Sequence, residues 1–110
     1  MSSDGLDPVF KALADSTRRR LLDVLREGPR TVGDLAGQVE GMSRFGVRKH
    51  LEVLEGAGLV ITRKEGRKRW KHLNALPLRR MYERWVSPYA DVWATNLESL
   101  ARHVERDDRA

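Results

Sequence analysis

Two short amphipathic helical patterns, joined by a three-residue connection, limit the fold of this chain more than any other feature. Thr31 and Asp34 form a variant of the capping box, which predicts the start of a helix of about two turns. The connection, residues 40–42, contains Gly41, and glycine adopts a positive φ without steric cost. Ser43 caps a second helix, whose apolar positions follow an i, i+4, i+7 spacing: Val47, Leu51 and Leu54. This pair of patterns predicts a helix-turn-helix.

Two further helices are predicted before this pair. Pro8 stands where the first position of a short helix is expected, because its missing N–H needs no partner there. Asp15 or Ser16 caps the next helix, and Gly28-Pro29 ends it. The chain therefore begins with helices that can cover the helix-turn-helix.

A β-hairpin is predicted directly after the helix-turn-helix. Residues 59–64 and 68–73 are rich in β-branched and aromatic side chains, and Glu65-Gly66 between them resembles a hairpin turn. A hairpin in this place is a wing. Helical signals resume at Asn74 and Pro77, with a kink or a fresh cap expected at Ser87-Pro88.

The basic charge of the chain is concentrated in its middle third. Residues 40–74 carry nine basic and four acidic groups, whereas residues 1–39 and 75–110 each carry six of either sign. Residues 63–71 alone hold six basic side chains against Glu65. A charged run is often only a solvated face, but an excess between neutral flanks favours contact with a polyphosphate such as double-stranded DNA.

The second helix of a helix-turn-helix usually enters the major groove of DNA. Arginine can bind guanine through two hydrogen bonds, and phenylalanine can pack on a thymine methyl group. For Phe45 the alternative is packing in the core, and for Arg44 and Arg48 it is simple exposure to solvent. The DNA-binding residues expected on this helix are Ser43, Arg44, Phe45, Arg48, Lys49 and His50. Those expected on the wing, as phosphate contacts, are Arg63, Lys64, Arg67, Lys68 and Arg69.

The C-terminal third carries an aromatic-rich apolar stripe at helical spacing. One small domain has little room to bury it, so we expect a homodimer interface formed with the first helix of a second copy. The alternatives are packing on the chain's own first helix, and a pocket that holds an unknown apolar effector. The interface residues expected are Val9, Phe10, Leu13, Trp85, Tyr89, Trp93, Leu97 and Leu100.

Several stretches resemble ArsR-type winged-helix regulators: residues 13–22, 31–36, 42–51, 54–60 and 63–70. The pattern S-x-x-x-V-x-K-H-L of that family falls on residues 43–51. The resemblance covers about residues 7–74 and implies a homodimeric bacterial transcription regulator, usually a repressor, that binds a palindromic operator. Phe45, Gly46 and Arg48 depart from the residues that many members carry, so the operator sequence cannot be transferred.

Many ArsR-type proteins sense metals, but this sequence has no cysteine. His103 is the only histidine of the C-terminal region, and its conceivable partners are scattered: Asp91, Glu98, Glu105 and Asp107. That spacing is poor for zinc, so we expect a member of a metal-site-lacking subgroup, with no cofactor.

The expected fold is mainly α with a small β-hairpin, in one winged helix-turn-helix domain over residues 1–110. Residues 5–74 form the DNA-binding core and residues 75–107 the dimerisation helices. No catalytic motif is present, which argues against an enzyme. The polar N-terminus and the short apolar runs predict a cytoplasmic protein with no membrane contact. A winged helix that binds only proteins is the alternative function.

Overall fold

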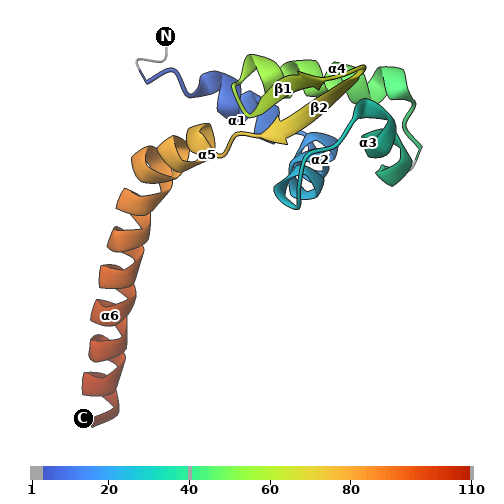
Figure 1. The fold of residues 1–110 in the computed structure, drawn as a ribbon. Helices are drawn as coiled ribbons and strands as arrows, with labels where there is room; N and C mark the ends of the chain where they lie inside the picture. The colour runs from blue at the N-terminus through green and yellow to red at the C-terminus, as the bar shows by residue number, and fades with distance from the viewer. Residues whose placement is uncertain (1–3, 40, 110) are drawn as a thin grey trace. The chain divides into compact units, whose positions relative to one another are not determined.

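The computed structural model describes residues 4–39 and 41–109, so Glu40 of the predicted connection lies outside the described residues. The chain divides into two compact units, Met1–Leu78 and Arg79–Ala110. The first unit holds four helices and an antiparallel hairpin (Figure 1). In chain order these elements are α1 (Asp7–Leu13), α2 (Ser16–Arg26), α3 (Val32–Gln38), α4 (Arg44–Gly56), β1 (Val60–Glu65) and β2 (Lys68–Leu73).

Side-chain caps set the starts of three helices. Asp15 caps α2 by accepting hydrogen bonds from the backbone amides of Thr17 and Arg18. Thr31 caps α3 in a complete capping box with Asp34, and the Ser43 hydroxyl oxygen caps α4. These caps satisfy amides that have no partner inside the helix, and all three were predicted from the sequence.

The core of the first unit is entirely apolar. Buried leucines and valines from every helix and from the start of β1 fill it, and those of α4 are Val47, Leu51 and Leu54. Val9 is only 3% exposed and also belongs to this core. Its prediction as a dimer contact is therefore wrong, because the side chain is already packed within its own unit.

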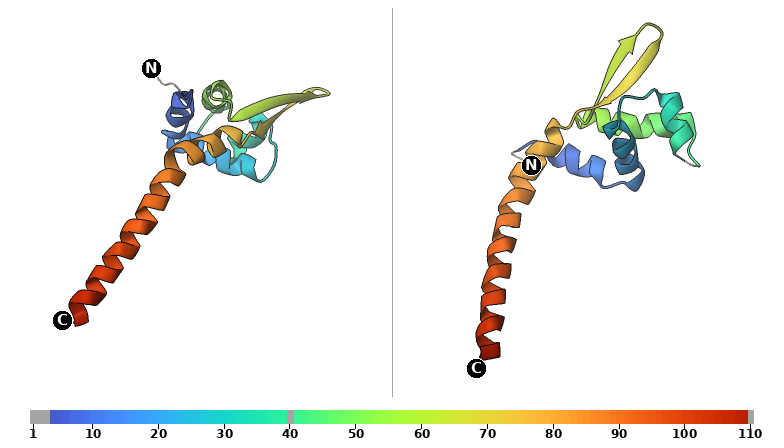
Figure 2. Two further views of the ribbon diagram at one scale, coloured as in Figure 1. Left: turned by 90° about the vertical axis from the view of Figure 1, so that its left-hand side faces the viewer. Right: turned by 60° about the horizontal axis from the view of Figure 1, so that its bottom comes forward.

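The hairpin is tied to the helices at its base. β1 and β2 pair in a register that sets Val60 opposite Leu73 and Glu65 opposite Lys68. The turn consists of Gly66 and the next residue, one position later than predicted, and Gly66 has a φ of +63°. A glycine with positive φ at the first turn position is typical of tight hairpins. Figure 2 shows the two-stranded hairpin projecting beyond the helices of this unit.

A short backbone bridge joins β2 to the start of the helix-turn-helix. The Arg30 amide donates to the Lys71 carbonyl at 3.1 Å, and the Lys71 amide donates to the Arg30 carbonyl at 2.7 Å. Because Arg30 directly precedes the α3 cap, this bridge fixes the beginning of α3 against the wing.

The last helical region begins with α5 (Leu76–Met81) and, in the second unit, contains a π-helical turn (Tyr82–Val86) and α6 (Ser87–Arg109). The kink or fresh cap predicted at Ser87-Pro88 takes the form of this π turn. The Ser87 amide donates to the Tyr82 carbonyl, five residues back. Pro88 has no amide to continue the normal pattern, and a widened turn accommodates the loss. Within the described residues, no helix is long and apolar enough to cross a bilayer.

Candidate nucleic-acid interface

The buried residues of α4 determine which of its side chains face outward. Val47, Leu51 and Leu54 occupy the core side of the helix, so the opposite side is presented to solvent. The outward side chains of α4 include four of those predicted to bind DNA. The exposed residues on this part of the helix are Arg44, Phe45, Arg48, Lys49 and Glu52.

Phe45 is exposed, although an aromatic side chain near a helix start could also have packed inward. It is 67% exposed, so the core-packing alternative is wrong. The ammonium nitrogen of Lys49 lies 5.2 Å from the centre of the Phe45 ring, a cation–π arrangement. Lys49 Nζ also lies 4.0 Å from a Glu52 carboxylate oxygen. The first two turns of α4 thus carry an outward apolar ring with a cation beside it.

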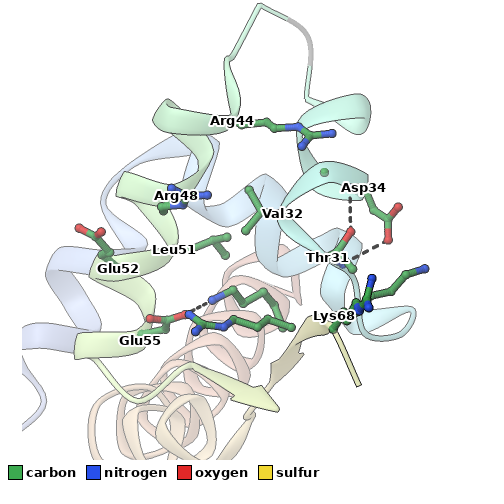
Figure 3. A pocket seen from close by; sticks show the side chains of 13 residues that line it. Thr31, Val32, Asp34, Arg44, Arg48, Leu51, Glu52, Glu55 and Lys68 are labelled. Atoms are coloured by element: carbon green, nitrogen blue, oxygen red, sulfur yellow. Dashed lines mark hydrogen bonds and ion pairs between the residues drawn. The ribbon is translucent and has the colours of Figure 1, made fainter. Parts of the chain in front are cut away.

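Arg44 reaches across to the first turn of α3 rather than straight outward (Figure 3). A Cβ atom at Gly33 would lie 3.2 Å from one guanidinium nitrogen and 3.5 Å from its central carbon. The absence of a side chain at Gly33 therefore lets the guanidinium lie against the α3 backbone. This position keeps the cation on the side of α4 that faces the wing.

A pocket of about 760 Å³ lies between α3, α4 and the wing (Figure 3). Six basic and three acidic side chains line it, together with small and apolar residues. Its basic lining residues are Arg44, Arg48, Arg67, Lys68, Arg69 and Lys71. The acidic ones are Asp34, Glu52 and Glu55. A concave, net positive surface of this kind suits a phosphodiester backbone.

Lys71 anchors the wing to α4. Its ammonium nitrogen lies 2.7 Å from a Glu55 carboxylate oxygen and 2.8 Å from the Thr62 hydroxyl oxygen, which itself donates to Glu55. The Lys71 side chain is only 12% exposed. Burial opposes the charged form of Glu55, but the hydrogen bonds from Lys71 and Thr62 outweigh it and lower the Glu55 pKa. The sequence indicated Lys71 only as one of the basic residues of the wing and gave no signal for Glu55.

All five wing residues predicted to contact phosphates are exposed: Arg63, Lys64, Arg67, Lys68 and Arg69. The strand register gives the wing two different faces, because directly opposed residues share a face. Lys64 and Arg69 lie on the face of the Thr62–Lys71 pair, which is tied to α4. Arg63 and Trp70 lie on the other face, where Lys68 Nζ is 5.8 Å from the centre of the Trp70 ring.

His50 is less exposed than the other residues predicted to bind DNA on α4, and it contacts α2. Its side chain is 21% exposed, and its Nδ1 atom lies 3.3 Å from a guanidinium nitrogen of Arg18 on α2. The helical spacing puts His50 on the side of α4 that packs against the other helices. The sequence gives no signal for this contact, because the two residues are 32 positions apart.

Among the side chains described, those of residues 4–39 and 41–105, no group of three or more His, Cys, Asp and Glu is arranged to hold a metal ion. The side chain of Asp107, one of the conceivable ligands, lies outside the described part of the chain.

Known proteins share this arrangement of helices and wing. Residues 13–63 match the model of a helix-turn-helix domain. The transcriptional repressor SdpR of Bacillus subtilis is 34% identical over 73 residues, which cover 66% of this chain and 80% of SdpR. A solved ArsR family transcriptional regulator is 34% identical, with a TM-score of 0.72, and the match covers 86% of this chain and 95% of that one. The chain belongs to the ArsR family.

This ArsR-family chain also resembles a homodimeric winged helix-turn-helix DNA-binding domain of Mycobacterium bovis, a possible ArsR-family regulator. That structure has a TM-score of 0.63 and 32% identity, and the match covers 80% of each chain. The predicted family and winged helix-turn-helix fold are therefore confirmed.

Proposed function

We propose that this ArsR-family protein is a transcriptional repressor that binds a palindromic DNA operator as a homodimer in the cytoplasm. The observation that carries the proposal is the basic concave surface between α4 and the wing. Its cations come from two elements that the Glu55–Lys71 ion pair holds together, which is the arrangement needed to hold a DNA strand beside the groove that α4 enters.

Base reading and phosphate binding fall to different residues in this proposal. Phe45 and Arg48 are exposed on α4 and reach base edges, and Arg44 does so from the wing side of the same helix. The exposed wing cations bind phosphates, which fixes the position of the protein without reading sequence. DNA as the ligand is supported by the relatives, since SdpR is a transcriptional repressor and the Mycobacterium bovis domain is DNA-binding.

The proposed dimer buries apolar side chains that are exposed in this single chain. On α6, Trp93 is 65% and Leu100 is 62% exposed, and Phe10 on α1 is 40% exposed. A soluble domain rarely exposes so many large apolar residues along one helix face without a partner. The proposed interface residues, with Val9 removed, are Phe10, Leu13, Trp85, Tyr89, Trp93, Leu97 and Leu100. The homodimeric Mycobacterium bovis relative supports a second copy as the partner.

Selection of binding sites from a random DNA library tests the proposal. The expected result is an enriched sequence made of two inverted half-sites, with centres about one or two helical turns apart. An unrelated basic protein of similar charge serves as the control for binding driven by charge alone. Failure to enrich any sequence, or enrichment of a single unpaired half-site, would contradict a dimeric operator-binding protein.

A further inference from the structure

Arg18 connects three helices of the first unit through one guanidinium group. Its Nε atom donates to the Ala12 carbonyl at 2.8 Å, and one terminal nitrogen donates to the Lys11 carbonyl at 2.9 Å. Both carbonyls belong to the last turn of α1, where the Lys11 carbonyl also accepts the Ala14 amide at 3.2 Å. The other terminal nitrogen lies 3.3 Å from Nδ1 of His50, in the middle of α4. Arg18 itself stands near the start of α2.

The chemistry of the Arg18–His50 contact fixes the state of the histidine ring. A guanidinium group has only donors, so Nδ1 of His50 must be the acceptor. With Nδ1 as the acceptor, the ring carries a proton on Nε2. Asp15, the cap of α2, lies 4.0 Å from the same Nδ1 atom, but its contacting oxygen already accepts the amides of Thr17 and Arg18. Arg18 is therefore the donor that orients the ring.

The Arg18–His50 contact is directional, unlike the apolar packing that holds the rest of α4. Leucine and valine packing is largely non-directional, whereas a hydrogen bond depends on both distance and angle. His50 lies between the buried Val47 and Leu54, on the side of α4 away from its exposed Phe45. A bond at this point restrains how α4 is rotated about its axis, and with it the direction of the exposed side chains.

We propose that Arg18 and His50 are positioning residues for sequence reading by α4. The proposal rests on the proposed function, because it assigns them a role in operator binding. Base edges demand side chains placed within a fraction of an ångström, while flexible wing cations bind phosphates over a wider range of positions. Loss of the bond should therefore lower discrimination between operator and random DNA more than it lowers binding to random DNA.

Two substitutions of His50 separate a positioning role from direct contact of the imidazole ring with DNA. His50→Leu removes the acceptor, whereas the side-chain oxygen of His50→Asn can accept near the place of Nδ1. The measurement is the dissociation constant for a selected operator and for a scrambled duplex at one salt concentration. We call the scrambled-duplex constant divided by the operator constant the discrimination ratio. For His50→Leu we expect this ratio to fall about tenfold, the size expected for a hydrogen bond to a charged group. For His50→Asn we expect a ratio close to that of the unsubstituted protein.

Arg18→Lys supplies a second, independent variant. A lysine keeps the charge but has one nitrogen and cannot span acceptors on α1 and α4 together, so its ratio should fall as it does for His50→Leu. This variant keeps the test decisive if circular dichroism shows that His50→Leu does not fold. A spectroscopic measurement without DNA adds to it: the nitrogen chemical shifts of His50 should report a proton on Nε2 and a hydrogen bond accepted at Nδ1.

Three results would overturn the proposal. One is an unchanged ratio in both His50→Leu and Arg18→Lys. Another is an equal loss in His50→Leu and His50→Asn, which would mean that the imidazole ring itself contacts DNA. The third is a ring protonated on Nδ1 at neutral pH. If the unsubstituted protein bound the selected and scrambled duplexes equally, the proposed function would fail, and this inference with it.

Discussion

Gly33 and Arg44 show how one missing side chain sets the place of a functional one. Any Cβ atom at position 33 would come within 3.2 Å of the Arg44 guanidinium, so the cation would have to move away from α3. The lack of a side chain at Gly33 thus gives the exposed Arg44 guanidinium room to lie close to the α3 backbone.

The first residue-scale prediction concerns Arg44→Ala. Loss of a guanidinium that contacts a base should weaken operator binding by about 1–3 kcal/mol, with a smaller effect on a scrambled duplex. Competition titrations of both duplexes measure the two effects. Equal weakening of specific and random binding would show that Arg44 contacts only phosphates.

The second residue-scale prediction concerns Phe45→Ala. Because the ring is 67% exposed, its removal should change the free energy of unfolding by no more than about 0.5 kcal/mol. Operator affinity should still fall by about 1 kcal/mol, near the lower end for a lost base contact. Urea unfolding and DNA titration of the same sample separate the two quantities. A large loss of stability would instead assign Phe45 a structural role.

At the scale of single residues, the sequence predicted contacts between neighbours and missed contacts between distant positions. The Asp15, Thr31 and Ser43 caps follow from residues at most three positions apart. The contact of His50 with Arg18 and the burial of Val9 depend on how whole helices pack, and no local pattern reports that.

The wing is an element whose attachment to α4 depends on one carboxylate. Hydrogen bonds lower the Glu55 pKa in the folded state below its ordinary value of 4.5. A carboxyl group with a lowered pKa contributes stability above its unfolded value and loses that contribution as pH falls through the folded value. The Glu55–Lys71 contribution should thus be complete at neutral pH and be lost as pH falls below 4.5 through the lowered pKa of Glu55.

Glu55→Gln tests the direction in which the Glu55–Lys71 contribution to stability changes with pH. At neutral pH the variant should be less stable by about 1 kcal/mol, since Glu55 is partly exposed and solvent screens the pair. The difference from the unsubstituted protein should shrink as pH falls below 4.5. Urea unfolding midpoints of both proteins across this range provide the measurement, and the shared titration of Asp15 and Asp34 cancels in the difference. A difference that grew toward low pH would contradict the role of the charged form.

A second prediction for the wing concerns salt. The double substitution Arg67→Ala with Lys68→Ala removes two exposed cations near the turn. The slope of log affinity against log salt should become shallower by about 2 for each copy of the chain, for operator and random duplexes alike. A matched control is Arg26→Ala with Arg20→Ala, two cations of α2 that do not line the basic pocket. An unchanged slope in the wing variant would remove these residues from the phosphate contacts.

The order of the elements and most of their bounds could be predicted from the sequence. Periodicity and caps placed the four helices of the first unit, and the β-branched runs placed both strands within one residue or so. The bridge between Arg30 and Lys71 could not be predicted, because a single paired residue leaves no repeating pattern. The π turn before Pro88 was predicted only as an interruption, since a proline shows where a helix is disturbed but not how it adapts.

At the scale of the whole molecule, the proposed dimer depends on the apolar face of α6. Trp93→Glu places a charge in the middle of this face, while Thr95→Glu places the same charge on the polar side. We expect Trp93→Glu to be monomeric and folded, because the side chain is exposed in the single chain, and Thr95→Glu to remain dimeric. Sedimentation equilibrium measures both states.

Loss of the dimer should also weaken operator binding by about 100-fold or more, because two linked half-site contacts become one. A dimeric Trp93→Glu protein with normal operator affinity would show that α6 is not the interface. The sequence pattern predicted this apolar face as a dimer interface, and its residues are exposed in the single chain, but a pattern within one chain does not identify the surface that covers it.

The two unlike faces of the wing restrict how the hairpin can change in length. Lys71 is fixed twice, by the Arg30 backbone and by the Glu55 carboxylate. Deletion of Trp70 would leave that base in place and bring Arg69 into the position of Trp70, on the opposite face, because side chains alternate along a strand. The position of Arg69 would then carry Lys68, which now lies on the Trp70 face. Viable changes in this strand should therefore come in steps of two residues.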